Sequence, residues 1–251
     1  MKKIAFVFFL FFLSVFNAEA KGFEDVDWET VTVKQVQKLI KAGADVKARD
    51  KNGVTALMPA AANNENPAVI EALIKAGVDV NARTEKGWTA LMLAAGKNEN
   101  PAVIEALLKA GADVKERDEL GMTALMFAAM RNNNPAVIEA LVKSGADVKE
   151  KAEFGQTVLM FAAMSNNNPA VIEALLKAGA DVKERNGWGT TALMSAAMSN
   201  NNPAVTEALL KSGADVKARD IEGRTVFDYA EKNPKIKGTP VYWKLNDLKY
   251  Q

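Results

Sequence analysis

Apolar and polar positions recur in blocks along the chain, and one block shows the elements that the pattern predicts. Residues 89–95 start with Thr89, a residue type that caps helices well, and continue with Ala, Leu and Met, so they predict a short helix. After a polar stretch, Asn100 as N-cap and Pro101 at the first helical position open a second predicted helix over residues 102–110. Each block therefore predicts a pair of helices.

The second predicted helix of the block is amphipathic. Its apolar stripe consists of Val103, Ile104, Leu107 and Leu108. Glu105 and Lys109 stand at i and i+4 on the opposite, solvent-facing side. Gly111 follows at the position where a left-handed cap ends a helix, and residues 112–121 read as an extended loop with a turn.

The block repeats with a fixed interval of 34 residues. One set of glycines keeps this interval: Gly43, Gly77, Gly111, Gly145, Gly179 and Gly213. A second set keeps it too: Gly53, Gly87, Gly121, Gly155, Gly189 and Gly223. The prolines that open the second helices follow the same interval: Pro67, Pro101, Pro135, Pro169 and Pro203. Three residue classes that share one period indicate a repeat array.

A single repeat is too small to fold alone. Burying four aliphatic side chains contributes roughly 6–12 kcal/mol, whereas ordering about 30 residues costs several times more. Stacked neighbours supply the missing burial, so the array needs several repeats and capped ends.

The repeated motif D-x-x-G-x-T-A-L-M-x-A-A, followed by V-I-E-A-L-L-K-A-G-A-D-V, resembles the ankyrin repeat. The resemblance implies an all-α fold: an ankyrin-repeat solenoid of stacked helix-turn-helix units with protruding loops or β-hairpin tips. We expect a single domain over residues 21–251, with a partial capping repeat at 21–49 and a C-terminal capping repeat at 220–251. The full repeats are expected at 50–83, 84–117, 118–151, 152–185 and 186–219.

The sequence departs from the ankyrin pattern at two points. A column of methionines stands where the family has histidine, so the histidine's hydrogen bond to the neighbouring loop must be lost: Met58, Met92, Met126, Met160 and Met194. We interpret this column as core packing. The ankyrin repeat usually has a period of 33 residues, and the 34th residue of each repeat here falls in the Asn-rich link between the helices. The combination N-P-A-V-I-E-A-L-L further resembles exported bacterial ankyrin proteins.

The two ends of the array read as caps. Residues 33–46 reproduce a second helix without the preceding T-A-L-M helix. Residues 225–230 start a further first helix, and residues 241–248 predict a divergent last helix in which Tyr242, Trp243 and Leu245 cover the final apolar face. Pro59 lies inside the first turn of its helix, where we expect it to cost a hydrogen bond.

The first 20 residues read as a cleaved export signal. Lys2 and Lys3 precede an uncharged apolar run over residues 4–16, and an A-x-A cleavage site ends at Ala20. An uncleaved membrane anchor is the alternative, but the run is shorter than the roughly 20 apolar residues that a span needs. The chain contains no cysteine to accept a lipid. We therefore expect a periplasmic or secreted protein that does not insert into the membrane after cleavage.

Composition narrows the possible chemistry. The chain has no histidine and no cysteine, which excludes imidazole bases, Ser-His triads and His or Cys zinc sites. We therefore predict no catalytic residue, no cofactor and no metal. Loss of Lys2, Lys3 and Glu19 on cleavage would leave 30 basic and 30 acidic residues. This balance gives no electrostatic reason to expect nucleic acid as a partner.

Differences between the repeats suggest where a partner binds. The second helices are nearly identical, whereas the loop tips and the two residues after Ala-Ala vary, and the resemblance implies that these positions line one concave face. The candidate partner-binding residues are Trp88, Leu120, Met122, Met130, Phe154, Gln156, Met164, Trp188 and Met198. Exposed aromatic and methionine side chains are typical anchors of a protein interface. The alternative is that these side chains only pack against adjacent tips.

These observations predict a protein-protein interaction module, monomeric and not an enzyme, that binds an unidentified protein or peptide. A hydrolase with paired carboxylates is one alternative, because that chemistry needs neither His nor Cys. Asp and Glu are plentiful, but they alternate with basic residues in repeated loops, as on solvated faces. A passive structural spacer is the other alternative, and the variation among the tips argues against it.

Overall fold

The computed structural model describes residues 22, 23 and 25–248, and these residues contain helices and loops but no β-sheet. The all-α, stacked helix-turn-helix fold expected from the sequence is confirmed. The second-helix positions carry α2 (Val33–Lys41), α4 (Pro67–Lys75), α6 (Pro101–Lys109), α8 (Pro135–Lys143), α10 (Pro169–Lys177), α12 (Pro203–Lys211) and α14 (Pro240–Leu248). The first-helix positions carry α3 (Leu57–Asn63), α5 (Ala90–Lys97), α7 (Ala124–Arg131), α9 (Val158–Ser165), α11 (Ala192–Ser199) and α13 (Val226–Ala230).

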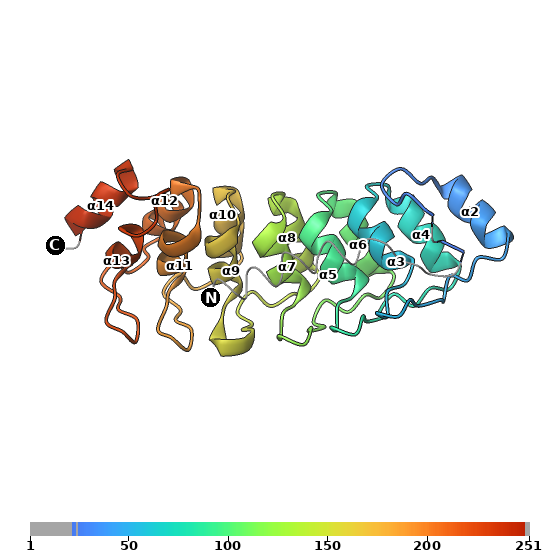
Figure 1. Ribbon diagram of the computed structural model, residues 1–251, viewed down its shortest axis with the longest axis horizontal. Helices are drawn as coiled ribbons and strands as arrows, with labels where there is room; N and C mark the ends of the chain where they lie inside the picture. The colour runs from blue at the N-terminus through green and yellow to red at the C-terminus, as the bar shows by residue number, and fades with distance from the viewer. Residues whose placement is uncertain (1–21, 24, 249–251) are drawn as a thin grey trace. The chain divides into compact units, whose positions relative to one another are not determined.

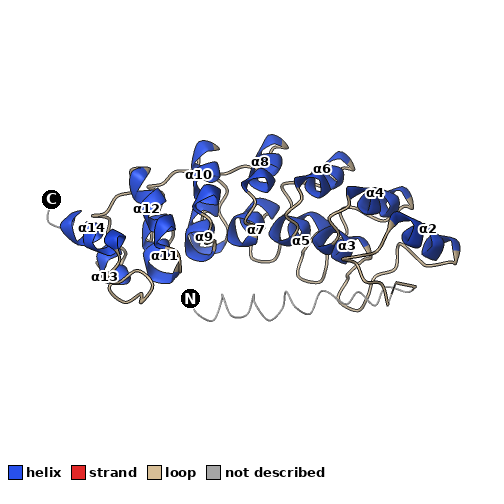
Figure 2. Ribbon diagram, turned by 90° about the horizontal axis from the view of Figure 1, so that it is seen from above, coloured by secondary structure: helices blue, strands red, loops and turns tan. Residues whose placement is uncertain are grey.

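The chain divides into two compact units. The first unit ends at Glu116 and the second begins at Arg117. Within each unit the first helices form one layer and the second helices form another, and the loops extend to one side of the helices (Figures 1 and 2). The predicted export signal, residues 1–20, lies outside the described residues.

Local capping explains where the helices begin and end. The hydroxyl of Thr89 accepts a hydrogen bond from the Met92 N–H at 3.3 Å at the start of α5. The side-chain oxygen of Asn100 accepts from the Ala102 N–H at 3.0 Å, and Pro101 is the first residue of α6. Gly111 has a φ of +91°, which is the left-handed conformation expected after the helix. The caps predicted from the sequence are confirmed.

The core of each repeat comes from both helices. On α6, Val103, Ile104 and Leu107 are fully buried, while Glu105 and Lys109 are exposed. The five methionines of the column are buried as predicted: Met58, Met92, Met126, Met160 and Met194. The methionine thioethers therefore serve as packing groups in the interior of the array.

Buried asparagines link successive repeats by hydrogen bonds. The side-chain amide of Asn166 donates to the carbonyls of Ala129 (3.1 Å) and Asn132 (2.8 Å) in the preceding repeat. Its side-chain oxygen accepts from the Asn168 N–H at 2.9 Å within its own repeat. The same donor pattern recurs at Asn64, Asn98, Asn200 and Asn233. We call these five residues the asparagine ladder.

The N-cap asparagines reinforce this link. The amide of Asn168 donates to the Asn133 carbonyl at 2.7 Å, and Asn202 donates to the Asn167 carbonyl at the same distance. The Asn-rich segment between the two helices of each repeat thus caps one helix and bonds the preceding repeat. These inter-repeat bonds lie at the opposite end of the first helix from its hydroxyl N-cap.

The C-terminal cap differs from expectation at one residue. Tyr242 and Leu245 are buried under the last repeat, as predicted for a covering helix. Trp243 remains 56% exposed, so the expectation that it covers the apolar face is wrong. Neighbouring residues of a helix point about 100° apart, so Tyr242 and Trp243 cannot both face the core. Trp243 instead contacts the Tyr242 ring edge-on, with ring centroids 5.1 Å apart.

Candidate partner-binding surface

Side-chain acceptors hold three of the loop tips of the second unit in shape. The carboxylate of Asp118 accepts hydrogen bonds from the N–H groups of Leu120 (2.9 Å) and Met122 (2.8 Å). Asn186 and Asp220 occupy the equivalent positions of later tips, and each accepts two N–H groups in the same way. A short polar side chain that closes its own turn is a common loop device.

Adjacent tips of the second unit are bonded to one another through the backbone. The Glu153 N–H donates to the Leu120 carbonyl at 3.1 Å. The Gly187 N–H donates to the Phe154 carbonyl at 2.8 Å, and the Ile221 N–H donates to the Trp188 carbonyl at 3.0 Å. These bonds bring Leu120, Phe154, Trp188 and Ile221 onto neighbouring tips, and we call these four residues the tip row.

The tip row presents large apolar side chains to solvent. Leu120 is 37% exposed, Phe154 is 58% exposed and Ile221 is 70% exposed. Trp188 is half-buried and stacks on Phe154, with ring centroids 5.0 Å apart and planes inclined by 28°. Ile221 was not among the residues expected from the sequence. Three full repeats carry glutamate at the position of Ile221: Glu85, Glu119 and Glu153. Comparing the tip of the C-terminal cap with these repeats would have revealed the apolar residue.

The expected exposure of Trp88 and Met122 is wrong. Trp88, in the first unit, is 4% exposed, and Met122, in the second unit, is 2% exposed. Both follow the tip glycine, where the chain reverses direction; Gly121, for example, has a φ of +72°. The residue after this reversal points into the repeat, whereas the residue before it points outward. Because the sequence does not show this change of direction, it could not separate the two positions.

The remaining candidates are half-buried. Met130, Met164 and Met198 lie near the ends of α7, α9 and α11, and Gln156 follows the glycine of its tip. Beside Met130, burial lowers the pKa of the Arg131 guanidinium. The three methionines recur at one position of successive first helices, so the second unit carries a row of partly accessible thioethers in addition to the tip row.

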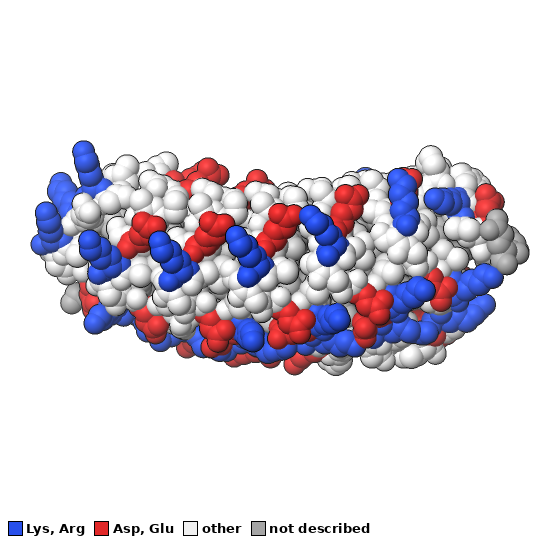
Figure 3. Space-filling view, turned by 180° about the vertical axis from the view of Figure 1, so that it is seen from behind, with Lys and Arg blue, Asp and Glu red and all other residues white. Residues whose placement is uncertain are grey.

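Charges near the tip row are unevenly neutralised. Arg117 pairs with Glu150 at 3.3 Å and donates to the Lys151 carbonyl at 3.0 Å, and Lys151 pairs with Glu184. Glu119 and Glu153 are exposed beside Leu120 and Phe154 and take part in none of the ion pairs found among residues 117–248. Arg185 and Arg219, at the later tips, are exposed as well and donate to backbone carbonyls instead of carboxylates, so the exposed charges of the tips include both signs. Elsewhere, Figure 3 shows basic and acidic side chains alternating on the face seen from behind.

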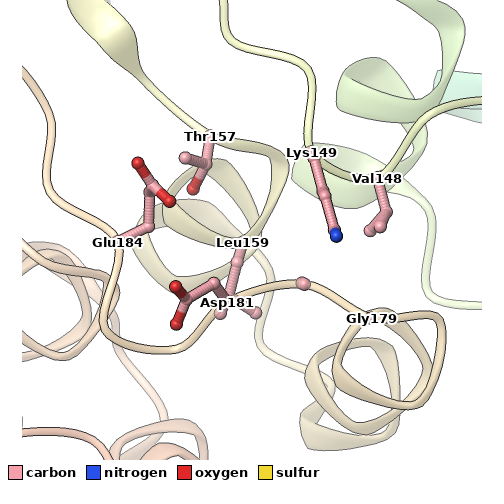
Figure 4. A pocket seen from close by; sticks show the side chains of 8 residues that line it. Val148, Lys149, Thr157, Leu159, Gly179, Asp181 and Glu184 are labelled. Carbon is pink, nitrogen blue, oxygen red and sulfur yellow. The ribbon is translucent and has the colours of Figure 1, made fainter.

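The second unit also has a small pocket. Its volume is about 280 Å³, and Val148, Lys149, Leu159, Asp181 and Glu184 are among its lining residues. Figure 4 shows Lys149 on one side and the carboxylates of Asp181 and Glu184 on the other. Glu184 is already paired with Lys151. The lining residues of the pocket come from loops and from α9, at positions that recur from repeat to repeat, so the tip row is the more distinctive feature.

At the last tip, a buried carboxylate has a displaced pKa. Burial of Asp220 acts to raise its pKa, but hydrogen bonds from Tyr229 and Arg224 outweigh burial and lower the pKa to about 2. Burial and the bond to Asp220 raise the pKa of Tyr229 to about 12. This cluster ties α13 to the tip of the C-terminal cap.

Two further findings concern metals and membranes. Among residues 22–248 that the structure describes, no group of three or more acidic side chains is placed to hold a metal ion. None of the described helices combines the length and apolar character needed to cross a membrane.

Comparison with known proteins agrees with this architecture. A family model described as "Ankyrin repeats (3 copies)" matches residues 31–118, 95–186 and 159–237. The crystal structure of the human ASB11 ankyrin repeat domain is similar, with a TM-score of 0.73 and 25% sequence identity. The match covers 85% of this chain and 91% of that chain. No curated protein matches the sequence. Since the family model covers most of the residues that form the stacked repeats, this chain belongs to the ankyrin repeat family.

Proposed function

We propose that this ankyrin protein is an exported, monomeric interaction module that binds another protein through the tip row of its second unit. Ankyrin repeats generally serve as protein-protein interaction scaffolds. The observation that carries the proposal is the exposure of Leu120, Phe154 and Ile221 on adjacent bonded tips. Apolar side chains grouped on a protruding surface are typical of an interface, because single exposed apolar residues are common but clusters are not.

The methionines beside the tips extend the proposed surface. Met130, Met164 and Met198 are half-buried, and flexible thioethers adapt to different partner shapes. The loop carboxylates Glu150 and Glu184 pair with basic residues instead of facing one another. This arrangement favours binding over a hydrolase with two facing carboxylates.

Affinity capture with matched variants tests the binding surface. The mature protein would be immobilised and exposed to periplasmic extract and culture fluid from its own source. Replacing Leu120, Phe154 and Ile221 together by Ala should reduce recovery of a specific partner at least about tenfold, because exposed anchors dominate interface energy. Trp243→Ala is the control, since it removes an equally exposed aromatic side chain far from the tips in sequence.

Equal recovery by the triple variant and the wild-type protein, with both shown to be folded by circular dichroism, would refute the proposed surface.

Export is tested separately by cell fractionation and by the mass of the mature chain. We expect a mature protein outside the cytoplasm that begins at Lys21. An intact N-terminus in a cytoplasmic fraction would contradict export and leave the binding surface unaffected.

A further inference from the structure

The methionines of residues 22–248 fall into two classes by burial. Six of them are no more than 2% exposed: Met58, Met92, Met122, Met126, Met160 and Met194. The other three are half-buried, and we call them the methionine row: Met130, Met164 and Met198. Solvent therefore reaches the side chains of the methionine row, while the repeats enclose the other methionines.

Three first helices of the second unit carry one methionine of each class, four residues apart. In α9, Met160 lies in the first turn and is 2% exposed, whereas Met164 lies in the last turn and is half-buried. Residues at i and i+4 share one face of a helix, so position along the helix makes the difference. The same pairing recurs in the neighbouring helices, with Met126 and Met130 in α7 and Met194 and Met198 in α11.

The methionine row is confined to the second unit. Ala62 and Gly96 stand at the equivalent positions of α3 and α5 in the first unit, so that unit has no thioether there. Within the second unit α9 packs against both α7 and α11 (Figure 1). The three thioethers thus occupy one position on adjoining helices, and a modification of all three would change a strip across the second unit alone.

Oxidation of sulfur is the chemistry open to these side chains. The chain has no cysteine, so methionine is its only sulfur-containing residue. When hydrogen peroxide oxidises a thioether by two electrons, the sulfur lone pair takes one peroxide oxygen, the O–O bond breaks and water leaves. The product, methionine sulfoxide, is polar. A dithiol reductant restores the thioether, becoming a disulfide while the oxygen leaves as water.

We propose that Met130, Met164 and Met198 are sites of reversible oxidation by peroxides, and that their oxidation weakens partner binding by the second unit. The buried methionines are protected, because an oxidant reaches them only after a local opening of the repeat. The sulfoxide oxygens oppose binding because an apolar partner would have to desolvate them. The effect on binding rests on the proposed function, whereas the choice of sites rests on burial alone.

Mapping of the oxidised residues tests the sites. The full mature protein would be treated with hydrogen peroxide, and tandem mass spectrometry would locate each added oxygen by its mass of about 16 Da. We expect the methionine row to be oxidised at least about tenfold faster than Met126, Met160 and Met194, which share its helices but need a local opening to react. In protein unfolded by urea, all six should react at the same rate.

Two matched variants test the effect on binding. Partner capture by the wild-type protein should fall at least about fivefold after peroxide treatment. It should recover after treatment with methionine sulfoxide reductases for both sulfoxide epimers. Replacing the methionine row by Leu keeps the side chains apolar, and capture by this variant should not change on peroxide treatment. Replacing Met126, Met160 and Met194 by Leu should leave the sensitivity to peroxide as in the wild type.

Separate outcomes would overturn each part of the inference. Equal oxidation rates for the methionine row and the buried methionines in the folded protein would overturn the choice of sites. Unchanged capture by fully oxidised wild type, or loss of capture by the peroxide-treated variant without the methionine row, would overturn the effect on binding. Failure to capture a partner before oxidation would refute the proposed function and the effect on binding together, whereas the mapping would still decide the sites.

Discussion

Single residues determine the conformation of the loop tips in the second unit. Asp118 and Asn186 each close a tip with two hydrogen bonds, whereas Ala152 provides none and Phe154 adopts a left-handed backbone. Left-handed conformation costs a non-glycine residue about 1–2 kcal/mol. The ring of Phe154 remains accessible because this turn holds it outward, so the left-handed backbone and the exposed ring occur at the same residue.

Asp220 should make the C-terminal cap sensitive to acid. Because its pKa of about 2 lies below the ordinary value of 3.8, the ionised form stabilises the folded state above pH 4. That stabilisation is lost as the pH falls from about 4 to about 2, and it amounts to about 2 kcal/mol. Urea unfolding of wild type and Asp220→Asn, measured across this range, checks the prediction.

Asp220→Asn should fold, because Asn186 makes the equivalent turn with an amide side chain. We expect its free energy of unfolding to change less between pH 4 and pH 2 than that of the wild type. Asp247→Asn, at an exposed aspartate of α14, is the control and should retain the wild-type profile. Identical pH profiles for Asp220→Asn and wild type would contradict the role of this carboxylate.

At the scale of elements, α3 shows how one residue changes a helix start. In α5 the Leu93 N–H donates to the Thr89 carbonyl at 3.2 Å. Pro59 occupies the equivalent position and has no N–H, so the sequence-based expectation of a lost hydrogen bond is confirmed. The Thr55 hydroxyl is buried without a partner, and α3 begins one residue later in its repeat than α5.

Leu93→Pro should impose the same defect on α5. We expect the first unit of this variant to be about 1–2 kcal/mol less stable than that of Leu93→Ala, because proline removes a hydrogen bond in addition to side-chain packing. Leu93→Ala is the matched control for the lost volume. Urea titration followed by circular dichroism measures the difference, and equal stabilities would show that this hydrogen bond contributes nothing.

At the scale of the whole molecule, the asparagine ladder connects repeats that cannot fold alone. The buried side chain of Asn166 makes three hydrogen bonds, two of them to the preceding repeat. Asn64 donates in the same way to Trp28 and Val31 of the N-terminal cap. The ladder thus satisfies backbone carbonyls at the link between successive repeats, where water has little access.

Asn166→Ala should therefore weaken the stacking of the second unit. We expect its free energy of unfolding to fall by about 2–4 kcal/mol, because the substitution leaves buried carbonyls without donors. Asn167→Ala, at the adjacent exposed residue, should change stability by less than about 0.5 kcal/mol. Chemical denaturation measures both variants, and similar losses would assign the effect to the loop backbone and not to the ladder.

The sequence by itself determined the repeat, its two helices and their caps. Thr89, Asn100, Pro101 and Gly111 act locally, so their roles could be inferred from their order in the chain. The burial of the methionine column, which includes Met92, could also be predicted from the sequence, because it depends on a period that every repeat shares.

Only the tertiary structure decided which loop residues face solvent. Leu120 and Met122 flank one glycine and are equally apolar, yet Leu120 is exposed and Met122 is buried. The difference arises from the reversal of the chain at Gly121 and from packing between repeats 34 residues apart. The ladder bonds of Asn166 also depend on contacts with the preceding repeat, so no local pattern could reveal them.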